Sequence, residues 1–239
     1  MKRLISCCLL FMCVRSFSQT IDVDKPDARP VAIKNLFTES GGTPFVEAKF
    51  VRFVSGSPFF IEKKMPGILI TSDRTEYKNI IIRLNLMESQ VNFLNSKQEE
   101  LIVGVPLREV ILWDTLNQKN YHFIFSDYIE TTDKPEKGIY QILQNGKAGL
   151  YIQHKKTVKE SRAFNSATFE QSIETISTYF LLLDGKWITI NKIKNLPSLL
   201  SDKKIEVQEY IKSKGLSGYK QEDVESVINY YNSLWADKH

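Results

Sequence analysis

The sequence predicts a mainly β protein: an antiparallel meander, forming an open sheet or a partial barrel, followed by a C-terminal helical hairpin. Two observations predict the sheet. From residue 43 onward, short runs of β-branched and aromatic residues alternate with turn residues, and Asn-Gly and Asp-Gly pairs separate some of these runs. A third observation predicts the helices, because apolar residues after position 196 recur every three or four positions.

The first eighteen residues have the pattern of a secretory signal. A basic start precedes an apolar run, and Ser16 and Ser18 supply small side chains before Gln19, where a signal peptidase is expected to cut. The apolar run is about half of the roughly 20 residues that cross a bilayer, so we expect cleavage and no membrane-spanning segment in the mature chain. The string Leu4-Ile5-Ser6-Cys7 leaves lipidation as a minor alternative.

Removal of this segment changes the charge and the chemistry of the chain. Its removal takes away Lys2, Arg3 and Arg15, so the mature chain has 29 basic and 28 acidic residues. A nearly neutral chain has no general attraction for nucleic acid or an anionic membrane. A mature chain without cysteine forms no disulfide, thiol nucleophile or cysteine metal site. The cysteines, all within the signal, are Cys7, Cys8 and Cys13.

Residues 19–42 contain two prolines and little periodicity, and we expect a leader or linker there, with one short turn or strand within 31–37. The antiparallel β domain is expected to cover 43–195. Its polar stretch 155–177 is expected to be an exposed loop or a short irregular element. The candidate strands are 45–54, 58–62, 66–71, 78–86, 90–95, 101–104, 107–113, 121–126, 138–144, 148–154, 178–183 and 186–192.

Four joints between these strands are expected to be hairpins. Asn145-Gly146 and Asp184-Gly185 adopt positive φ angles at low cost, as a type I′ turn requires. Two further turns are expected at 72–74 and 87–89.

The region 196–239 is expected to form the helical hairpin. Ser201 or Asp202 caps the first helix, and Gly215 stands where a left-handed residue ends it. The second helix, at about 220–235, is expected to pack on the sheet through one apolar face; the alternative is that this face receives a partner. The face consists of Val224, Val227, Ile228, Tyr231, Leu234 and Trp235.

The histidines do not have the spacing of metal ligands. His239 is the C-terminal residue, and neither His122 nor His154 has a second ligand two or four positions away. Strand alternation directs His122 away from Phe123 and Phe125, so we interpret both internal histidines as surface residues. The string at 55–59 lacks the second glycine of a serine-nucleophile elbow, and no phosphate-binding glycine loop is present. The sequence therefore assigns no catalytic residue, cofactor or metal ligand.

Charged residues are concentrated in two regions of the sequence, one acidic and one rich in lysine. The first contains three acidic residues, Asp127, Glu130 and Asp133, near Tyr128 and Trp113 in the sequence. Paired carboxylates with aromatic residues that stack on a sugar would suit a glycan hydrolase. A solvated acidic turn is the preferred interpretation. Eight lysines and three acids, with no arginine, occupy residues 186–220. We interpret this lysine-rich region as a hydrated helix face, with attraction to anionic envelope polymers as a second hypothesis.

Several short strings together resemble uncharacterised exported β-rich proteins of Bacteroidota-type bacteria. They are Ser16-Phe17-Ser18, which directly precedes Gln19, Gly56-Ser57-Pro58-Phe59-Phe60, Arg83-Leu84-Asn85 and Asn229-Tyr230-Tyr231-Asn232. Leu84 departs from the aromatic residue expected in this group. The resemblance implies an envelope protein and transfers no site residue.

We therefore expect an exported, non-catalytic binding or assembly module in the periplasm or at the cell surface of a Gram-negative bacterium, with an envelope protein or glycan as partner. The alternatives are a β-barrel-like carrier of an apolar small molecule and a carboxylate-based hydrolase of envelope glycans.

Overall fold

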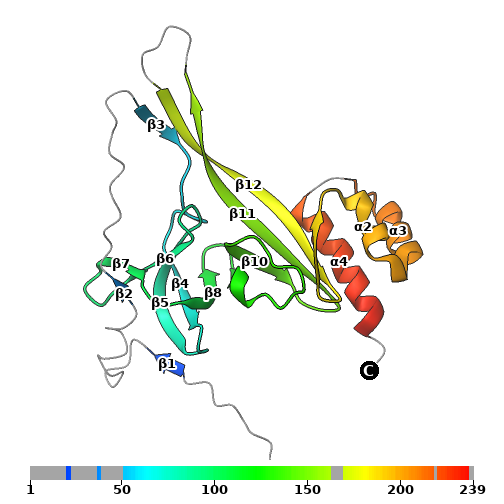
Figure 1. Ribbon diagram of the computed structural model, residues 1–239, viewed down its shortest axis with the longest axis horizontal. Helices are drawn as coiled ribbons and strands as arrows, with labels where there is room; N and C mark the ends of the chain where they lie inside the picture. The colour runs from blue at the N-terminus through cyan, green and yellow to red at the C-terminus, as the bar shows by residue number, and fades with distance from the viewer. Residues whose placement is uncertain (1–19, 23–36, 39–50, 163–168, 218–219, 237–239) are drawn as a thin grey trace, which may run out of the picture.

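Antiparallel pairing between strands that follow one another in the chain dominates the structure. The computed structural model describes residues 20–22, 37–38, 51–162, 169–217 and 220–236, in which thirteen strands form one open sheet (Figure 1). The predicted mainly β class with C-terminal helices is confirmed. The strands are β1 (Thr20–Asp22), β2 (Phe37–Thr38), β3 (Val51–Ser55), β4 (Met65–Thr71), β5 (Glu76–Asn85), β6 (Gln90–Leu94), β7 (Glu100–Val103), β8 (Leu107–Asp114), β9 (Lys119–Phe125), β10 (Ile139–Gln144), β11 (Ala148–Ser161), β12 (Phe169–Leu183) and β13 (Lys186–Ile190).

Two meanders make up the sheet. Strands β4 to β7 form the first and β8 to β13 form the second, and they meet where β8 pairs with β4. Between the two meanders the chain crosses from β7 to the far side of β4. β1 and β3 add parallel pairs to β5 and β12, and β2 pairs with β7. Residues 20–22 and 37–38, from the predicted leader, thus belong to the sheet.

The two glycine turns differ in conformation. Asp184 and Gly185 have φ angles of 50° and 76°, so both occupy the left-handed region that a type I′ turn requires. At Asn145-Gly146 only the glycine has a positive φ, of 154°, and the pairing of β10 with β11 shifts register before the turn. The second hairpin is confirmed, but its predicted type I′ geometry is wrong.

A contact from the C-terminal helix explains the unusual turn. The side-chain amide of Asn232 accepts a hydrogen bond from the backbone N–H of Ala148 (2.8 Å) and donates one to its carbonyl oxygen (2.9 Å). A Cβ at Gly146 would lie 2.7 Å from Asn232 Nδ2, so the glycine admits this side chain. Tertiary contact therefore sets the geometry of this turn.

The helices follow the sheet as predicted, except at one cap. They are α2 (Leu196–Leu199), α3 (Lys204–Ser213) and α4 (Gln221–Ala236). Gly215, with a φ of 64°, follows the end of α3 as expected. Neither Ser201 nor Asp202 caps α3, because both lie in a short 3₁₀ turn. Asp202 instead accepts a hydrogen bond from the hydroxyl of Tyr231 (2.9 Å).

The helices cover part of one sheet face, which we call the inner face. The apolar residues of α4 pack on β11, β12 and β13, so the predicted docking of the helical hairpin is confirmed (Figure 1). Phe123 lies opposite Gln141, which lies opposite Ile152, so β9, β10 and β11 share this face. Away from the helices, the inner face is filled by side chains of β4, β5, β6, β8 and β9, with Phe60 packed against Phe123.

The opposite, outer face carries an aromatic cluster. It consists of Tyr140, Tyr151, Phe180 and Trp187, and the ring centroids of the contacting pairs are 5.0–5.6 Å apart. Ile129, which follows β9, packs on this cluster. Burial raises the pKa of Tyr140 to about 12.

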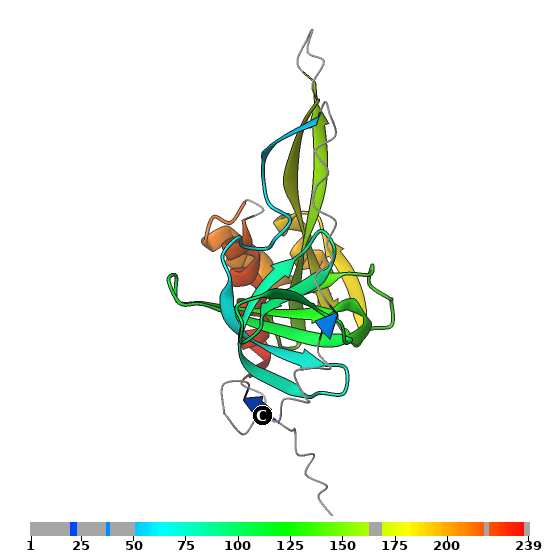
Figure 2. The same cartoon turned by 90° about the vertical axis from the view of Figure 1, so that its left-hand side faces the viewer.

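Strands β11 and β12 extend beyond the rest of the sheet. β10 pairs with β11 as far as Ile152, and β13 pairs with β12 from Tyr179. Residues 153–161 and 169–178, which we call the ribbon, therefore project from the body, and β3 joins them near the tip (Figures 1 and 2). The predicted loop at 155–177 is wrong for these residues. Charged and polar side chains outnumber apolar ones along both strands of the ribbon, and the β-branched residues among them favour a strand that is solvated on both faces.

A second correction concerns the predicted strand at 58–62. These residues make a single bridge, between Phe59 and Asn85, and otherwise run as an irregular connection from β3 to β4. The predicted signal, its cysteines and most of the leader lie outside the described residues, as does His239.

Candidate functional site: a pocket at the base of the ribbon

A pocket of about 200 Å³ lies where the ribbon leaves the body. Three separate segments line it: the β5–β6 turn, the residues that lead into β10, and the first residues of the ribbon. We call it the ribbon-base pocket. Its lining residues are Leu86, Met87, Ser89, Glu136, Lys137, Gly138, Ile139, Gln153, His154, Lys155 and Lys156.

His154 is held in a neutral state by its surroundings. Its Nδ1 lies 2.9 Å from Ser177 Oγ, and its Nε2 lies 3.1 Å from Gln141 Oε1. The ring also contacts Phe60, with centroids 5.5 Å apart. Burial, followed by the charge of Lys156, lowers the pKa of His154 to about 4. The predicted surface histidine is therefore a largely buried one in the middle of β11, with a partner at each nitrogen.

Two lysines of the ribbon differ in their partners. Lys155 is exposed and its Nζ lies 2.9 Å from Glu136 Oε1. Lys156 is partly buried, and burial lowers its pKa. Glu62 acts on Lys156 only as a more distant charge, and among the described residues no carboxylate forms an ion pair with it. The pocket thus contains an ammonium group that no carboxylate of the described residues contacts directly.

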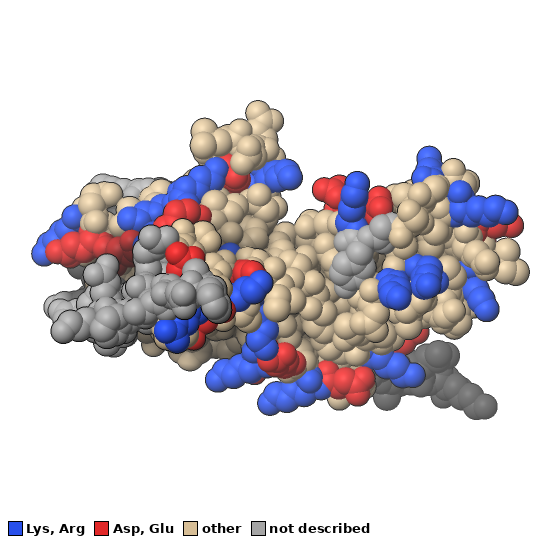
Figure 3. All heavy atoms as spheres, turned by 90° about the horizontal axis from the view of Figure 1, so that it is seen from above, with Lys and Arg blue, Asp and Glu red and all other residues tan. Residues whose placement is uncertain are grey.

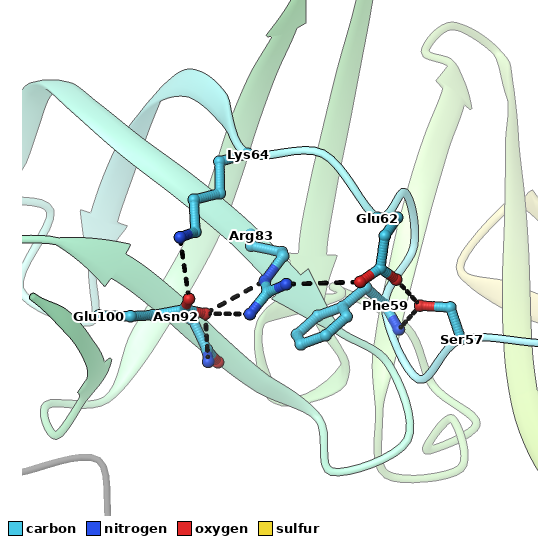
Figure 4. Close-up of polar contacts among 7 residues, drawn as sticks. All are labelled: Ser57, Phe59, Glu62, Lys64, Arg83, Asn92 and Glu100. Carbon is cyan, nitrogen blue, oxygen red and sulfur yellow. Dashed lines mark hydrogen bonds and ion pairs between the residues drawn. The ribbon is translucent and has the colours of Figure 1, made fainter. Parts of the chain in front are cut away.

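The irregular β3–β4 segment, residues 56–64, fastens the ribbon base to the first meander. At one end Gly56, with a φ of 96°, lies so close to the backbone of Ile173 that a Cβ would be 2.2 Å from its oxygen. Further along, Phe59 lies under the guanidinium of Arg83, whose carbon is 3.7 Å from the ring centroid (Figure 4). Ser57 donates a hydrogen bond to Glu62.

Arg83 links this segment to the neighbouring strands. Its Nε and Nη2 donate to Glu100 Oε1 at 3.1 and 2.6 Å, and Asn92 donates to the same oxygen at 2.9 Å (Figure 4). Lys64 Nζ lies 3.2 Å from the other oxygen of Glu100. Burial alone would raise the pKa of Glu100, but these hydrogen bonds outweigh it and hold the pKa below its usual value. The cluster fixes β5, β6 and β7 against the segment.

A second ion pair anchors the end of the segment. Lys63 donates to Asp114, whose side chain is 1% exposed. Asp114 also accepts hydrogen bonds from the backbone N–H groups of Leu116 and Asn117, each at 3.1 Å. The hydrogen bond from Lys63 is the main reason that the pKa of Asp114 lies far below its usual value. This carboxylate closes the β8–β9 turn.

His122 lies on the outer face, opposite to Phe123 and Phe125, as strand alternation predicts. Its Nε2 is 2.7 Å from Glu109 Oε2. The hydrogen bond from His122 and the neighbouring Arg108 hold the pKa of Glu109 below its usual value despite burial.

The acidic residues after β9 do not converge on a cleft. Asp127, Glu130 and Asp133 are all exposed, whereas Ile129 between them is buried. Tyr128 lies beside Arg108, with 5.3 Å between the guanidinium carbon and the ring centroid. This segment covers the outer face, as expected for a solvated acidic turn.

The lysine-rich region lies around the helices. Viewed from above, basic side chains gather at the helical end, and both signs alternate elsewhere on this face (Figure 3). Within the lysine-rich region, Lys203 pairs with Glu206 at 3.0 Å. An open groove of about 520 Å³ lies between α3 and α4, where Tyr210 and Tyr230 stack with centroids 4.2 Å apart.

The pocket was not predictable as a site from the sequence, because its three walls are about 50 and 15 residues apart in the chain. The one local indication was the histidine followed by two lysines at 154–156. Among the described residues, no group of three or more His, Cys, Asp or Glu side chains is placed to hold a metal ion.

None of the described helices is long and apolar enough to span a membrane. Comparison with protein-family models, curated proteins and solved structures finds no match to this chain.

Proposed function

We propose that this chain is an exported, non-catalytic binding module of the cell envelope and that the ribbon is its contact surface. The observation that carries the proposal is that exposed apolar side chains lie along this projecting element, on both of its faces. Among the described residues, seven large apolar side chains are exposed, and four of them lie on the ribbon or the adjoining β3. These four are Val54, Val158, Phe169 and Ile176, with 38–54% of their surface exposed.

A projecting ribbon of this kind is costly to maintain in water. An isolated two-stranded hairpin is marginally stable, and here only the tip gains a third strand. Exposed apolar groups on such an element are available to a partner that packs along both faces of the ribbon. The predicted secretory signal supports the proposal that this partner belongs to the envelope.

The ionisable side chains of the body support a binding role. Asp114 closes a turn, Glu100 joins strands to the β3–β4 segment, and the nitrogens of His154 are both occupied by hydrogen bonds. Each of these groups therefore has a structural role in the fold. The filled inner face likewise favours a binding module over a carrier, since Phe60, Phe93 and Phe123 pack where a ligand cavity would lie.

Retention on envelope material tests the proposal. The mature protein is incubated with peptidoglycan sacculi, with lipopolysaccharide vesicles and with outer-membrane vesicles from a Gram-negative bacterium, and the bound fraction is measured after sedimentation. A ribbon variant carrying Val158→Ser and Ile176→Ser is expected to lose most of the retention. The matched control carries Leu116→Ser and Ile205→Ser, since these side chains are 81% and 69% exposed but lie outside the ribbon.

Equal retention of the two variants would contradict the assignment of the ribbon. Absence of retention on all three materials would contradict the envelope-binding role itself.

A further inference from the structure

We propose that the ribbon-base pocket binds an oxyanion, a carboxylate or a phosphate, carried on a sugar-sized envelope component. This inference rests on the proposed envelope-binding function and deepens it by naming the ligand class. It is carried by the pocket and by the charges that line it.

The charge of the lining favours an anion. Lys137, Lys155 and Lys156 contribute three positive charges, and Glu136, which pairs with Lys155, is the one acidic residue among the lining side chains. Lys156 is partly buried and has no ion-pair partner among the described residues. An ammonium group taken partly out of water is destabilised until a counter-charge reaches it. An oxyanion entering the pocket supplies that charge.

The size and the remaining lining favour a small hydroxylated ligand. The volume of about 200 Å³ is below the roughly 300–1,000 Å³ of pockets for drug-sized molecules. Ser89 and Gln153 present polar groups to hydroxyls, and Leu86 and Met87 present apolar surface to a C–H face. An acidic monosaccharide unit combines these three features. A neutral sugar brings no anionic group into contact with Lys156, where the more distant Glu62 is the acting negative charge, and is expected to bind weakly.

The pocket also lies where a glycan is able to reach the ribbon. Gln153, His154, Lys155 and Lys156 are the first residues of the ribbon, so a ligand in the pocket is continuous with the proposed contact surface. His154 shapes this wall as a neutral group, because Gln141 and Ser177 occupy its two nitrogens. The structure therefore favours a glycan over a protein as the envelope partner.

The test is a calorimetric or NMR titration of the mature protein with four probes: glucuronate, glucose 6-phosphate, inorganic phosphate and glucose. Glucuronate or glucose 6-phosphate is expected to bind at least tenfold more tightly than glucose, and added salt is expected to weaken the binding. The two acidic sugars distinguish a carboxylate from a phosphate, and inorganic phosphate shows how much the sugar body contributes.

Two variants assign the binding to the pocket. Lys156→Gln is expected to weaken the preferred acidic sugar about tenfold, because a charge-assisted hydrogen bond is lost. Gln153→Glu, which adds a negative charge to the lining, is expected to weaken it by a similar factor. The control is Lys78→Gln on β5, where the lysine pairs with Glu76 at 3.3 Å outside both the pocket and the ribbon.

Equal affinity for glucose and both acidic sugars would overturn the inference, and so would equal loss in Lys156→Gln and Lys78→Gln. The proposed function fails separately. If envelope material is retained through the ribbon but no acidic sugar binds, only the pocket assignment falls. If acidic sugars bind in the pocket and no envelope material is retained, the envelope-binding role falls.

Discussion

Replacing His154 by glutamine is expected to remove a pH dependence of stability between pH 7.5 and pH 5. The histidine has a pKa of about 4 in the folded protein, mainly because of burial, against about 6.5 in the unfolded chain. Between these two values the unfolded chain binds a proton that the folded protein does not. The contribution of neutral His154 to the free energy of unfolding is therefore present above the unfolded pKa of about 6.5 and is lost as the pH falls toward 4.

The size of the effect follows from the two pKa values. Linkage between protonation and unfolding gives a loss of about 2 kcal/mol between pH 7.5 and pH 5 for this one residue. Most of the window lies above the range in which Glu100, Glu109 and Asp114 titrate, because the pKa of each of these carboxyls is lowered in the folded protein. The slope in this window is thus assigned mainly to His154.

Urea denaturation at half-unit pH steps measures the slope. The wild type is expected to lose about 2 kcal/mol over the window, and His154→Gln is expected to have a nearly constant free energy of unfolding. Gln153→Asn is the control, since Gln153 precedes His154 in β11, carries no ionisable group and is expected to leave the slope in place. An unchanged slope in His154→Gln would refute the assignment of a buried, neutral histidine.

Three further changes test the architecture by urea denaturation. Asp114→Ala is expected to lower the urea midpoint, because two backbone N–H groups and a lysine lose their acceptor. Asn232→Ala is expected to cost about 1–2 kcal/mol through its two bonds to the β10–β11 turn, whereas the exposed Asn229→Ala is not; equal costs would contradict the contact. Gly56→Ala is expected to cost more than Gly215→Ala, since a Cβ at the first meets backbone at 2.2 Å and at the second meets nothing within 4 Å; the reverse order would argue against the close approach of β3 to β12.

The parts of the fold that depend on neighbouring residues were predictable from the sequence. The Asp184-Gly185 turn and the apolar face of α4 depend on conformational preference and spacing within a few residues, and the structure has both. The pairing of β8 with β4 was not predictable, because it depends on how two meanders dock. The conformation of the Asn145-Gly146 turn was not predictable either, because a contact with a helix about 85 residues later in the chain determines it.

The ribbon and the pocket were not predictable from the sequence, because the residues that form them are mostly polar. Residues 155–161 are dominated by charged and polar side chains, and composition alone does not separate a loop from a ribbon that is solvated on both faces. The burial of His154 depends on Phe60, which approaches from a distant part of the chain. The alternation of His122 with Phe123, by contrast, is a property of the strand itself and was predicted.

Hydrogen exchange of the protein bound to envelope material tests the central claim most directly. Backbone amides of the ribbon, at 154–161 and 170–178, are predicted to exchange more slowly in the bound state, while those of α3 and α4 remain unchanged. Slower exchange confined to α3 and α4, with the ribbon unaffected, would contradict the claim that the ribbon is the contact surface.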